Sequence, residues 1–164
     1  PAGEAADPHL RVLILAGGIG SRFWPASTPS RPKQLLPLGS ERPLVADAVR
    51  RAVSLGGIDG VRVLAGESLQ GPLRTALPEL PAGAFRVEPR ARGTAPVLAW
   101  AAAEALRQDP DVVLVSLHSD HVIHPPEALD ALLCAVSEID MATPPRMTGF
   151  GGIRQISEMP VRIR

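Results

Sequence analysis

Residues 12–22 read VLILAGGIGSR, and this stretch decides the fold that the sequence predicts. Its first five residues, Val12–Ala16, form a continuous apolar run of strand length. Such runs, without polar alternation, belong to strands covered on both faces, as in parallel sheets. The glycines that follow allow a sharp turn and bring backbone N–H groups close to an anion or a base. We therefore predict a central parallel strand with a glycine-rich loop at its carboxyl end.

Further strands alternate with helices along the chain. Apolar runs predict strands at 61–65, 85–88 and 112–117, and helical spacing or composition predicts helices at 44–55, 68–77, 97–107 and 126–139. Gly56 and Gly57 are expected to end the first helix, and Thr94 to cap the third. The alternation is typical of a three-layer α/β/α fold with a mainly parallel sheet. Residues 11–140 are expected to form its core, after an N-terminal extension at 1–10.

The composition excludes several classes of protein. The 164 residues include 17 basic and 17 acidic side chains, so no overall field draws the chain onto nucleic acid or anionic lipid. No apolar run approaches the roughly 18 residues that span a bilayer, and the single cysteine, Cys134, cannot form an intrachain disulfide. We expect a cytoplasmic protein without nucleic-acid or membrane partners, and a homodimer is left open.

Residues 17–38 form a long loop that contains four prolines, which helix interiors and central strands rarely tolerate. Lys33 is the only lysine beside sixteen arginines, and its compact charge suits contact with a reacting phosphate. The glycine spacing fits neither a dinucleotide fingerprint, because Phe23 takes the place of the third glycine, nor a P-loop. An inert surface lysine and a purely structural glycine turn are the alternatives.

Three histidines, His118, His121 and His124, surround Asp120 at the end of the fourth predicted strand. Histidines and an aspartate are common zinc ligands, so a zinc site is one interpretation. The residues lie at a strand end rather than on one helix face, so the three rings need not converge. Histidines on a solvated loop are the other interpretation.

Three stretches resemble the sugar-1-phosphate nucleotidyltransferase family. Residues 13–38 (LILAGGIGSRFWPASTPSRPKQLLPL) resemble its signature, and F-W-P at 23–25 with P-K-Q at 32–34 is most similar to the mannose-1-phosphate guanylyltransferases. Residues 88–96 (EPRARGTAP) resemble the family's E-P-x-x-R-N-T-A-P, with Gly93 where asparagine is usual. Residues 115–123 (VSLHSDHVI) resemble its strand end with P-A-D-H, in which His121 is expected to orient the loop.

The resemblance implies a Rossmann-like, glycosyltransferase-A-like fold and an activity that converts GTP and mannose 1-phosphate into GDP-mannose and pyrophosphate with Mg²⁺. It implies catalytic roles for Arg22 and Lys33, and Asp120 as the metal ligand. The nucleotide-binding residues that it implies are Leu15, Ala16, Gly17, Gly18, Gly20, Ser21, Glu88, Arg92, Thr94 and Ala95. Another sugar-1-phosphate nucleotidyltransferase, with a different base or hexose, and a non-catalytic nucleotide-binding relative are the alternatives.

Residues 141–164 resemble an incomplete sugar-binding part of the same domain. Residues 145–151 (PRMTGFG) are similar to the family's P-E-T-G-Y-G, and residues 157–160 (SEMP) to its E-K-P, with Met147 and Met159 in place of the charged residues. Gly149 and Glu158 would then face the sugar. Because the two motifs lie closer together than in the family, whose members continue further, we expect a chain that is truncated or abridged after about residue 140.

Overall fold

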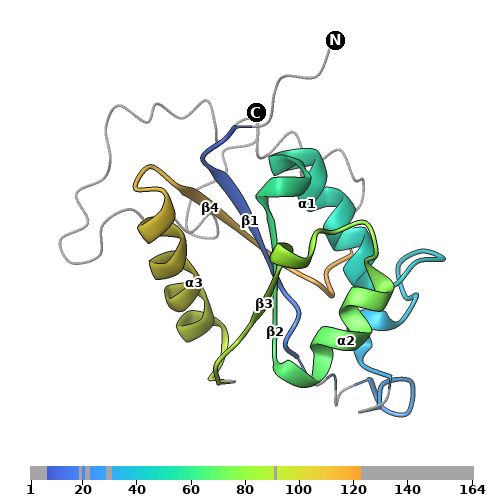
Figure 1. Ribbon diagram of the computed structural model, residues 1–164. Coiled ribbons are helices and arrows are strands. Elements are labelled where there is room, and N and C mark those ends of the chain that lie inside the picture. The colour runs from blue at the N-terminus through green and yellow to red at the C-terminus, as the bar shows by residue number, and fades with distance from the viewer. Residues whose placement is uncertain (1–6, 19, 21–22, 29–30, 91, 123–164) are drawn as a thin grey trace, which may run out of the picture.

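The computed structural model describes residues 7–18, 20, 23–28, 31–90 and 92–122. Four strands form one parallel sheet in the order β3-β2-β1-β4 (Figure 1). The helix predicted at 126–139 and the residues 141–164 lie outside the described part of the chain. The strands are β1 (Leu10–Leu15), β2 (Val61–Ala65), β3 (Phe85–Val87) and β4 (Val113–His118); the helices are α1 (Leu44–Gly60), α2 (Glu67–Ala76), α3 (Thr94–Gln108) and the short 3₁₀ helices η2 (Lys33–Leu35) and η3 (Ala82–Ala84).

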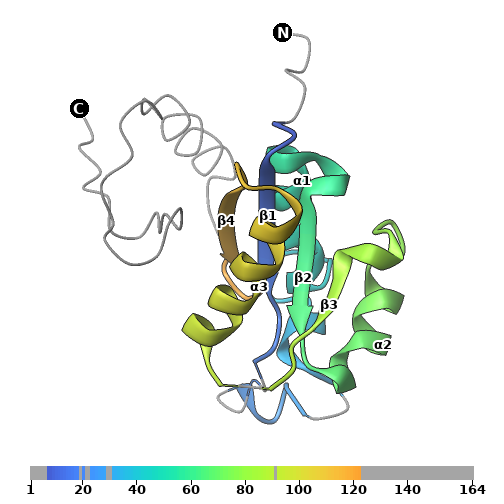
Figure 2. The ribbon, with the colours of Figure 1, turned by 60° about the vertical axis from the view of Figure 1, so that its left-hand side comes forward.

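The order of the strands explains the three layers. From β1 the chain moves outward through β2 to β3, and then returns through α3 to β4 on the other side of β1. Right-handed crossovers in opposite directions place their helices on opposite faces of a sheet. Figure 1 accordingly shows α1 and α2 on one face and α3 on the other, and Figure 2 shows the same layers after a turn of 60°. The predicted three-layer α/β fold is confirmed.

Apolar residues on both faces of the sheet hold the layers together. β1 lies between β2 and β4, and its Ile14 pairs with Val63 on one side and Leu117 on the other. The larger core, beneath α1 and α2, includes the fully buried Val12 and Ile14, whereas Leu13 packs with the smaller core beneath α3. Alternate side chains of one continuous apolar run are therefore covered on opposite faces, as expected for a central parallel strand.

The predicted break at the glycine pair is confirmed, whereas the predicted cap of the third helix was wrong. Gly57 has φ 65° and ψ 169°, which is not helical, so the first helical segment of α1 ends at the glycine pair and a second segment follows the kink to Gly60. Gly93, not Thr94, precedes the first turn of α3 as its cap residue, and it has no side chain to offer the free N–H groups. The strand predictions agree with the observed strands to within two residues. No helix in the described ranges is long and apolar enough to cross a membrane.

Candidate functional site

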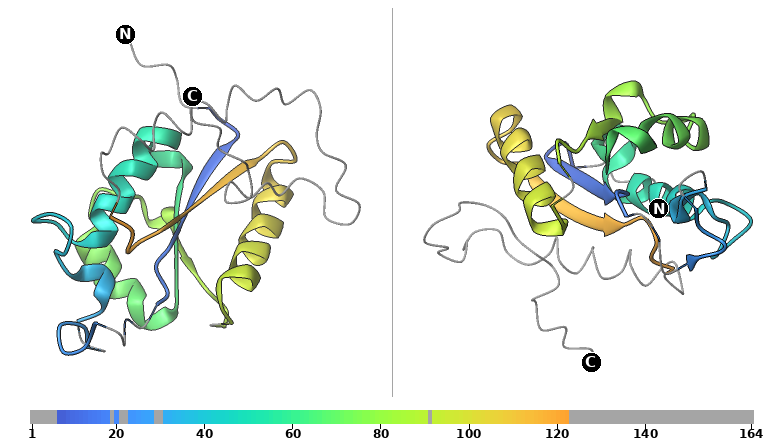
Figure 3. Two further views of the ribbon diagram at one scale, coloured as in Figure 1. Left: turned by 180° about the vertical axis from the view of Figure 1, so that it is seen from behind. Right: turned by 90° about the horizontal axis from the view of Figure 1, so that it is seen from below.

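The candidate site lies where the chain connections diverge on either side of β1. In open parallel sheets, ligands bind outside the carboxyl ends of the strands at such a switch point. A cavity of about 240 Å³ opens there, at the ends of β1, β2 and β4. It is lined by Leu15, Gly17, Gly18, Lys33, Leu64, Glu88, Gly93, Thr94, Val97, His118, Ser119 and Asp120. Figure 3 shows from below how α3 and the β1–α1 loop lie on either side of the sheet at this end.

A second hollow lies under α3, toward the amino ends of β1 and β2. Its lining includes Arg11, Arg62 and Arg86, but its volume is about 30 Å³. This is room for about one water molecule. The cavity at the carboxyl ends is therefore the better candidate for a ligand site.

Backbone hydrogen bonds continue past the ends of the strands and hold the cavity loops. The amide of Ala16 donates to the Leu64 carbonyl (2.9 Å), that of Glu88 to the Ala65 carbonyl (2.9 Å) and that of Ser119 to the Leu15 carbonyl (3.1 Å). Each loop therefore leaves the sheet in a direction that the neighbouring strand determines.

The buried side chain of Gln34 holds the start of the glycine-rich loop (residues 17–20, the glycine loop) by hydrogen bonds. Its side chain is 1% exposed, and its Nε2 donates to the carbonyls of Ala16 (2.6 Å) and Gly18 (2.7 Å). Both carbonyls that flank Gly17 are thus held by one side chain, while Gly17 and Gly18 stay exposed toward the cavity. No role is predicted for Gln34 from the sequence, although a glutamine directly before Leu35 and Leu36 was a signal that a buried polar group lies there.

Gly20 makes room for Lys33. Its φ is +72°, and a Cβ on it would lie 2.7 Å from Ser27 Oγ and 2.8 Å from Lys33 Cβ. Since this backbone conformation and this spacing both exclude a side chain, only glycine fits here. Lys33 passes beneath the loop, with its Nζ 5.9 Å from the centre of the Phe23 ring, and forms an ion pair with Asp120 across the cavity.

Burial and Lys33 act in opposite directions on the pKa of Asp120. Partial burial by itself would raise the pKa of this carboxyl group. The hydrogen bond and the charge of Lys33 outweigh that effect, and the pKa of Asp120 lies below its usual value. Asp120 is therefore an anion at neutral pH and a suitable ligand for a cation.

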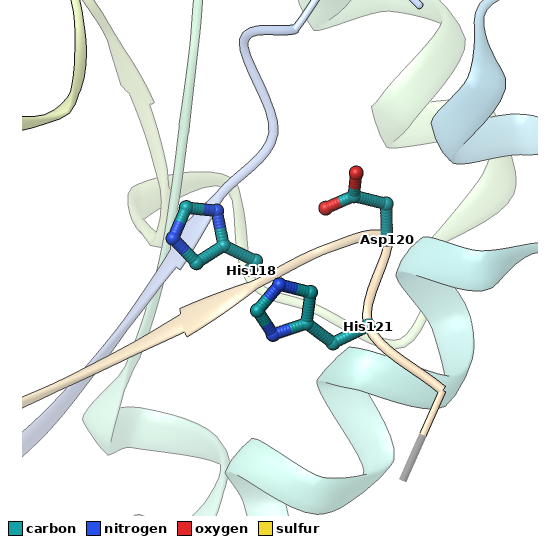
Figure 4. A group of neighbouring side chains, drawn as sticks. All are labelled: His118, Asp120 and His121. Carbon is teal, nitrogen blue, oxygen red and sulfur yellow. The ribbon is translucent and has the colours of Figure 1, made fainter. Parts of the chain in front are cut away.

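Asp120 belongs to a turn that brings two histidines beside it. Figure 4 shows His118, at the end of β4, and His121 with neighbouring rings, whose centres are 4.7 Å apart. One ligand atom from each of His118, Asp120 and His121 lies within 4.8 Å of the others. Burial, and then the charge of His121, lower the pKa of His118, which favours its neutral form. His124 lies outside the described residues.

The amino end of α3 forms another wall of the cavity. Gly93 has φ 90° and ψ 179°, and a Cβ added to it would meet nothing within 4 Å. No side chain among the described residues caps the helix, so the first N–H groups of α3 and the positive end of its dipole lie beside the cavity, where Thr94 lines it. Such helix ends attract anions and polar ligand atoms.

The family model described as nucleotidyl transferase matches residues 11–143. The chain belongs to the nucleotidyl transferase family. This confirms the resemblance that the glycine loop, the segment at 88–96 and the end of β4 indicated. The matched range begins in β1 and includes every element that forms the cavity.

Curated relatives of this nucleotidyl transferase chain are longer proteins. It is 38% identical over 121 residues to xanthan biosynthesis protein XanB from Xanthomonas campestris pv. campestris, covering 73% of this chain and 26% of the relative. It is 34% identical to alginate biosynthesis protein AlgA from Pseudomonas putida, covering 87% and 31%, and 32% identical to mannose-1-phosphate guanylyltransferase 2 from Escherichia coli O157:H7, covering 93% and 32%. The chain thus spans about a quarter to a third of the length of these relatives.

Solved structures show the same fold. A crystal structure described as mannose-1-phosphate geranyltransferase from Thermus thermophilus matches with a TM-score of 0.68 and 27% identity, covering 77% of this chain and 37% of that one. A glucose-1-phosphate thymidylyltransferase structure from Bacillus anthracis matches with a TM-score of 0.58 and 23% identity, covering 79% and 51%, and supports the fold alone.

The structure places the predicted site residues of this nucleotidyl transferase in three groups. Those that line the cavity are Leu15, Gly17, Gly18, Lys33, Glu88, Thr94 and Asp120. Ala16 and Gly20 instead support the loop from within, and Arg92 and Ala95 are exposed outside the lining. Ser21, Arg22, Gly149 and Glu158 lie outside the described residues. The cavity also includes Leu64, Val97 and Ser119, which sequence reasoning missed because apolar and small residues carry no functional signal of their own.

Proposed function

We propose that this chain supplies the nucleotide-binding part of a mannose-1-phosphate guanylyltransferase, which converts GTP and mannose 1-phosphate into GDP-mannose and pyrophosphate. The observation that carries the proposal is the cavity at the switch point, because it gathers the glycine loop, Lys33, Asp120 and the amino end of α3. The names of relatives such as mannose-1-phosphate guanylyltransferase 2 of Escherichia coli O157:H7 support the choice of substrates.

The reaction needs charge neutralisation and alignment more than it needs a protein nucleophile. An oxygen of the sugar phosphate attacks the α-phosphorus of GTP, a new P–O bond forms, and the bond to pyrophosphate breaks. Both reactants are anions, so positive groups held in fixed positions lower the barrier. Lys33, whose stem is packed under Gly18 and Gly20, supplies such a charge at the cavity. Arg22 is proposed to supply a second.

Glu88 is proposed to select guanine. Its Oε2 lies 3.2 Å from the position that a Cβ on Gly17 would take, so the carboxylate stands directly over the glycine loop. Guanine presents two neighbouring donors, N1–H and the N2 amino group, on its Watson–Crick edge, and a carboxylate can accept from both. Adenine offers only one amino group there. This geometry supports GTP over ATP.

A divalent cation is proposed at Asp120. The resemblance implies Mg²⁺, which is proposed to reach Asp120 together with the nucleotide, because this ion takes phosphate oxygens and water as its other ligands. When bound, such a cation neutralises charge on the phosphates and orients them. In the described structure, Asp120 instead pairs with Lys33, so the pair also keeps the lysine ammonium within the cavity.

Binding and turnover test the proposal together. The 164-residue chain is expected to bind GTP more tightly than ATP or dTTP in isothermal titration calorimetry. In a protein that contains this chain together with a sugar-binding part, Lys33→Ala is expected to lower kcat for pyrophosphate release by about 100-fold or more, the range found for fixed groups that stabilise transition-state charge. Arg50→Ala, on the exposed side of α1, is the control and should leave kcat unchanged.

Two results would contradict these assignments. Undiminished pyrophosphate release by the Lys33→Ala variant would remove the role given to Lys33. Equal affinity for the three nucleotides would favour a relative with another base, which is the second candidate. That candidate also has structural support, because Gly93 leaves open space beside the cavity where the family's segment has asparagine.

A further inference from the structure

We propose that His118, Asp120 and His121 form a three-ligand site for a divalent cation that prefers imidazole, with Zn²⁺ and Co²⁺ as the matching ions. These are the residues that the described structure brings together as a group of metal-ligating side chains. The site contains the expected metal ligand Asp120 but adds two nitrogen donors to it, one of them from a position where the family motif has proline. The binding of metal by these side chains does not depend on the proposed nucleotidyl transfer.

The three side chains need only small movements to surround an ion. Their ligand atoms already lie within 4.8 Å of one another. Bonds of about 2.0–2.2 Å in a tetrahedral site would place such atoms about 3.3 Å apart. The two rings lie 4.7 Å apart, and Figure 4 shows the Asp120 carboxylate on the same side of the turn as His118. The proposal therefore requires the side chains to rotate toward one another, which is a smaller change than moving the backbone of the turn.

The turn that carries these residues is held from two sides. The Ser119 amide donates to the Leu15 carbonyl (3.1 Å), and Ser119 is 1% exposed. From α1, the Arg51 guanidinium donates through Nη2 to the His121 carbonyl (2.9 Å). A fixed backbone lowers the ordering cost of binding, because the ligands start near their bound positions.

The donor set determines which ions fit. Mg²⁺ prefers oxygen ligands in octahedral geometry, whereas imidazole suits Zn²⁺ and neighbouring transition-metal ions. One carboxylate and two imidazoles leave a fourth position for water or for a phosphate oxygen. Since His118 and Asp120 both line the cavity, an ion held by them would border the space in which the nucleotide is proposed to bind.

Lys33 and the metal ion would compete for the carboxylate of Asp120. The lysine ammonium pairs with one carboxylate oxygen, and a cation on this carboxylate competes with it. This competition lowers the affinity for the metal ion. Conversely, metal binding would weaken the ion pair between Asp120 and Lys33. The ammonium would then be available to a phosphate in the same cavity.

Metal titrations of the purified, chelator-treated 164-residue chain test the site without nucleotide. Calorimetry is expected to show one equivalent of Zn²⁺ or Co²⁺ bound at least 100-fold more tightly than Mg²⁺, and bound Co²⁺ should give visible absorption bands of low coordination number. His118→Ala and His121→Ala should each weaken Co²⁺ binding by at least about tenfold, since even partners outside the ligand shell are worth that much. His9→Ala is the control, because His9 lies beyond the amino end of β1, at the other end of the sheet.

The outcomes separate this proposal from the proposed function. Co²⁺ affinity that is unchanged in both histidine variants, or Mg²⁺ binding as tight as Zn²⁺ binding, would overturn the site. Circular dichroism confirms that each variant is folded, and His118→Asn provides a second, polar replacement that should lose affinity as His118→Ala does. Metal binding that persists in a chain unable to bind GTP would refute only the nucleotide assignment.

Discussion

Replacing Gln34 with leucine tests how the glycine loop is held. Leucine has a similar size but donates no hydrogen bond, so Gln34→Leu removes the bonds to the Ala16 and Gly18 carbonyls. At about 1 kcal/mol net for each bond, the free energy of unfolding should fall by about 2 kcal/mol. With a urea dependence of roughly 2 kcal/mol per molar, the unfolding midpoint should drop by about 1 M.

Gln70 provides a matched control for this experiment. It is also buried, and its Nε2 donates to the carbonyls of Ala65 (3.0 Å) and Arg86 (3.2 Å), which lie on β2 and β3 away from the glycine loop. Gln70→Leu should therefore lower the urea midpoint by a similar amount. Only Gln34→Leu should increase hydrogen exchange at the Ala16 amide, which donates to the Leu64 carbonyl at the start of the loop, and weaken GTP binding by about tenfold, equivalent to about 1.4 kcal/mol.

Two results would refute the reasoning about Gln34. An unchanged urea midpoint in Gln34→Leu would mean that the two hydrogen bonds do not stabilise the fold. Equal hydrogen exchange at the Ala16 amide in both variants would mean that Gln34 stabilises the domain in general and does not position the loop. The exchange measurement does not require nucleotide binding, so it remains decisive even if GTP proves to be the wrong ligand.

Two further predictions concern the backbone and a surface ion pair. Gly93→Ala should lower the free energy of unfolding by about 1–3 kcal/mol in urea titrations, because φ 90° with ψ 179° strains any residue with a Cβ; Gly83→Ala, where φ is ordinary and space is open, should change it little. The hydrogen bond and charge of Asp109 raise the pKa of His9, and those of His9 lower the pKa of Asp109. The pair therefore stabilises the fold fully between about pH 4 and pH 6.5, and this contribution is lost as pH rises through the raised pKa of His9. His9→Ala should make the melting temperature less dependent on pH between about pH 6 and pH 9; an unaltered pH dependence would exclude a contribution from the pair.

The local sequence was enough to predict the architecture. The apolar run at 12–16 predicted a strand covered on both faces, and the alternation of strands and helices predicted the parallel three-layer fold. It also predicted that the glycine loop and Asp120 follow strands and so meet at one edge of the sheet. Burial and periodicity are local properties of the chain, and for this reason residue order was sufficient. Thr94 shows the limit, because the start of α3 depends on the packing around it.

The contacts between distant side chains were decided only by the tertiary structure. Nothing in the residues near Gln34 predicts that its amide reaches Ala16 and Gly18, and the spacing of His118 and His121 left open whether their rings converge. Lys33 and Asp120, 87 residues apart, form a pair because β4 returns to the side of β1 where the loop passes. Crossover direction and core packing determine these distances, and both depend on the whole domain. Composition alone therefore marked Lys33 as unusual, but only the fold gave it Asp120 as a partner.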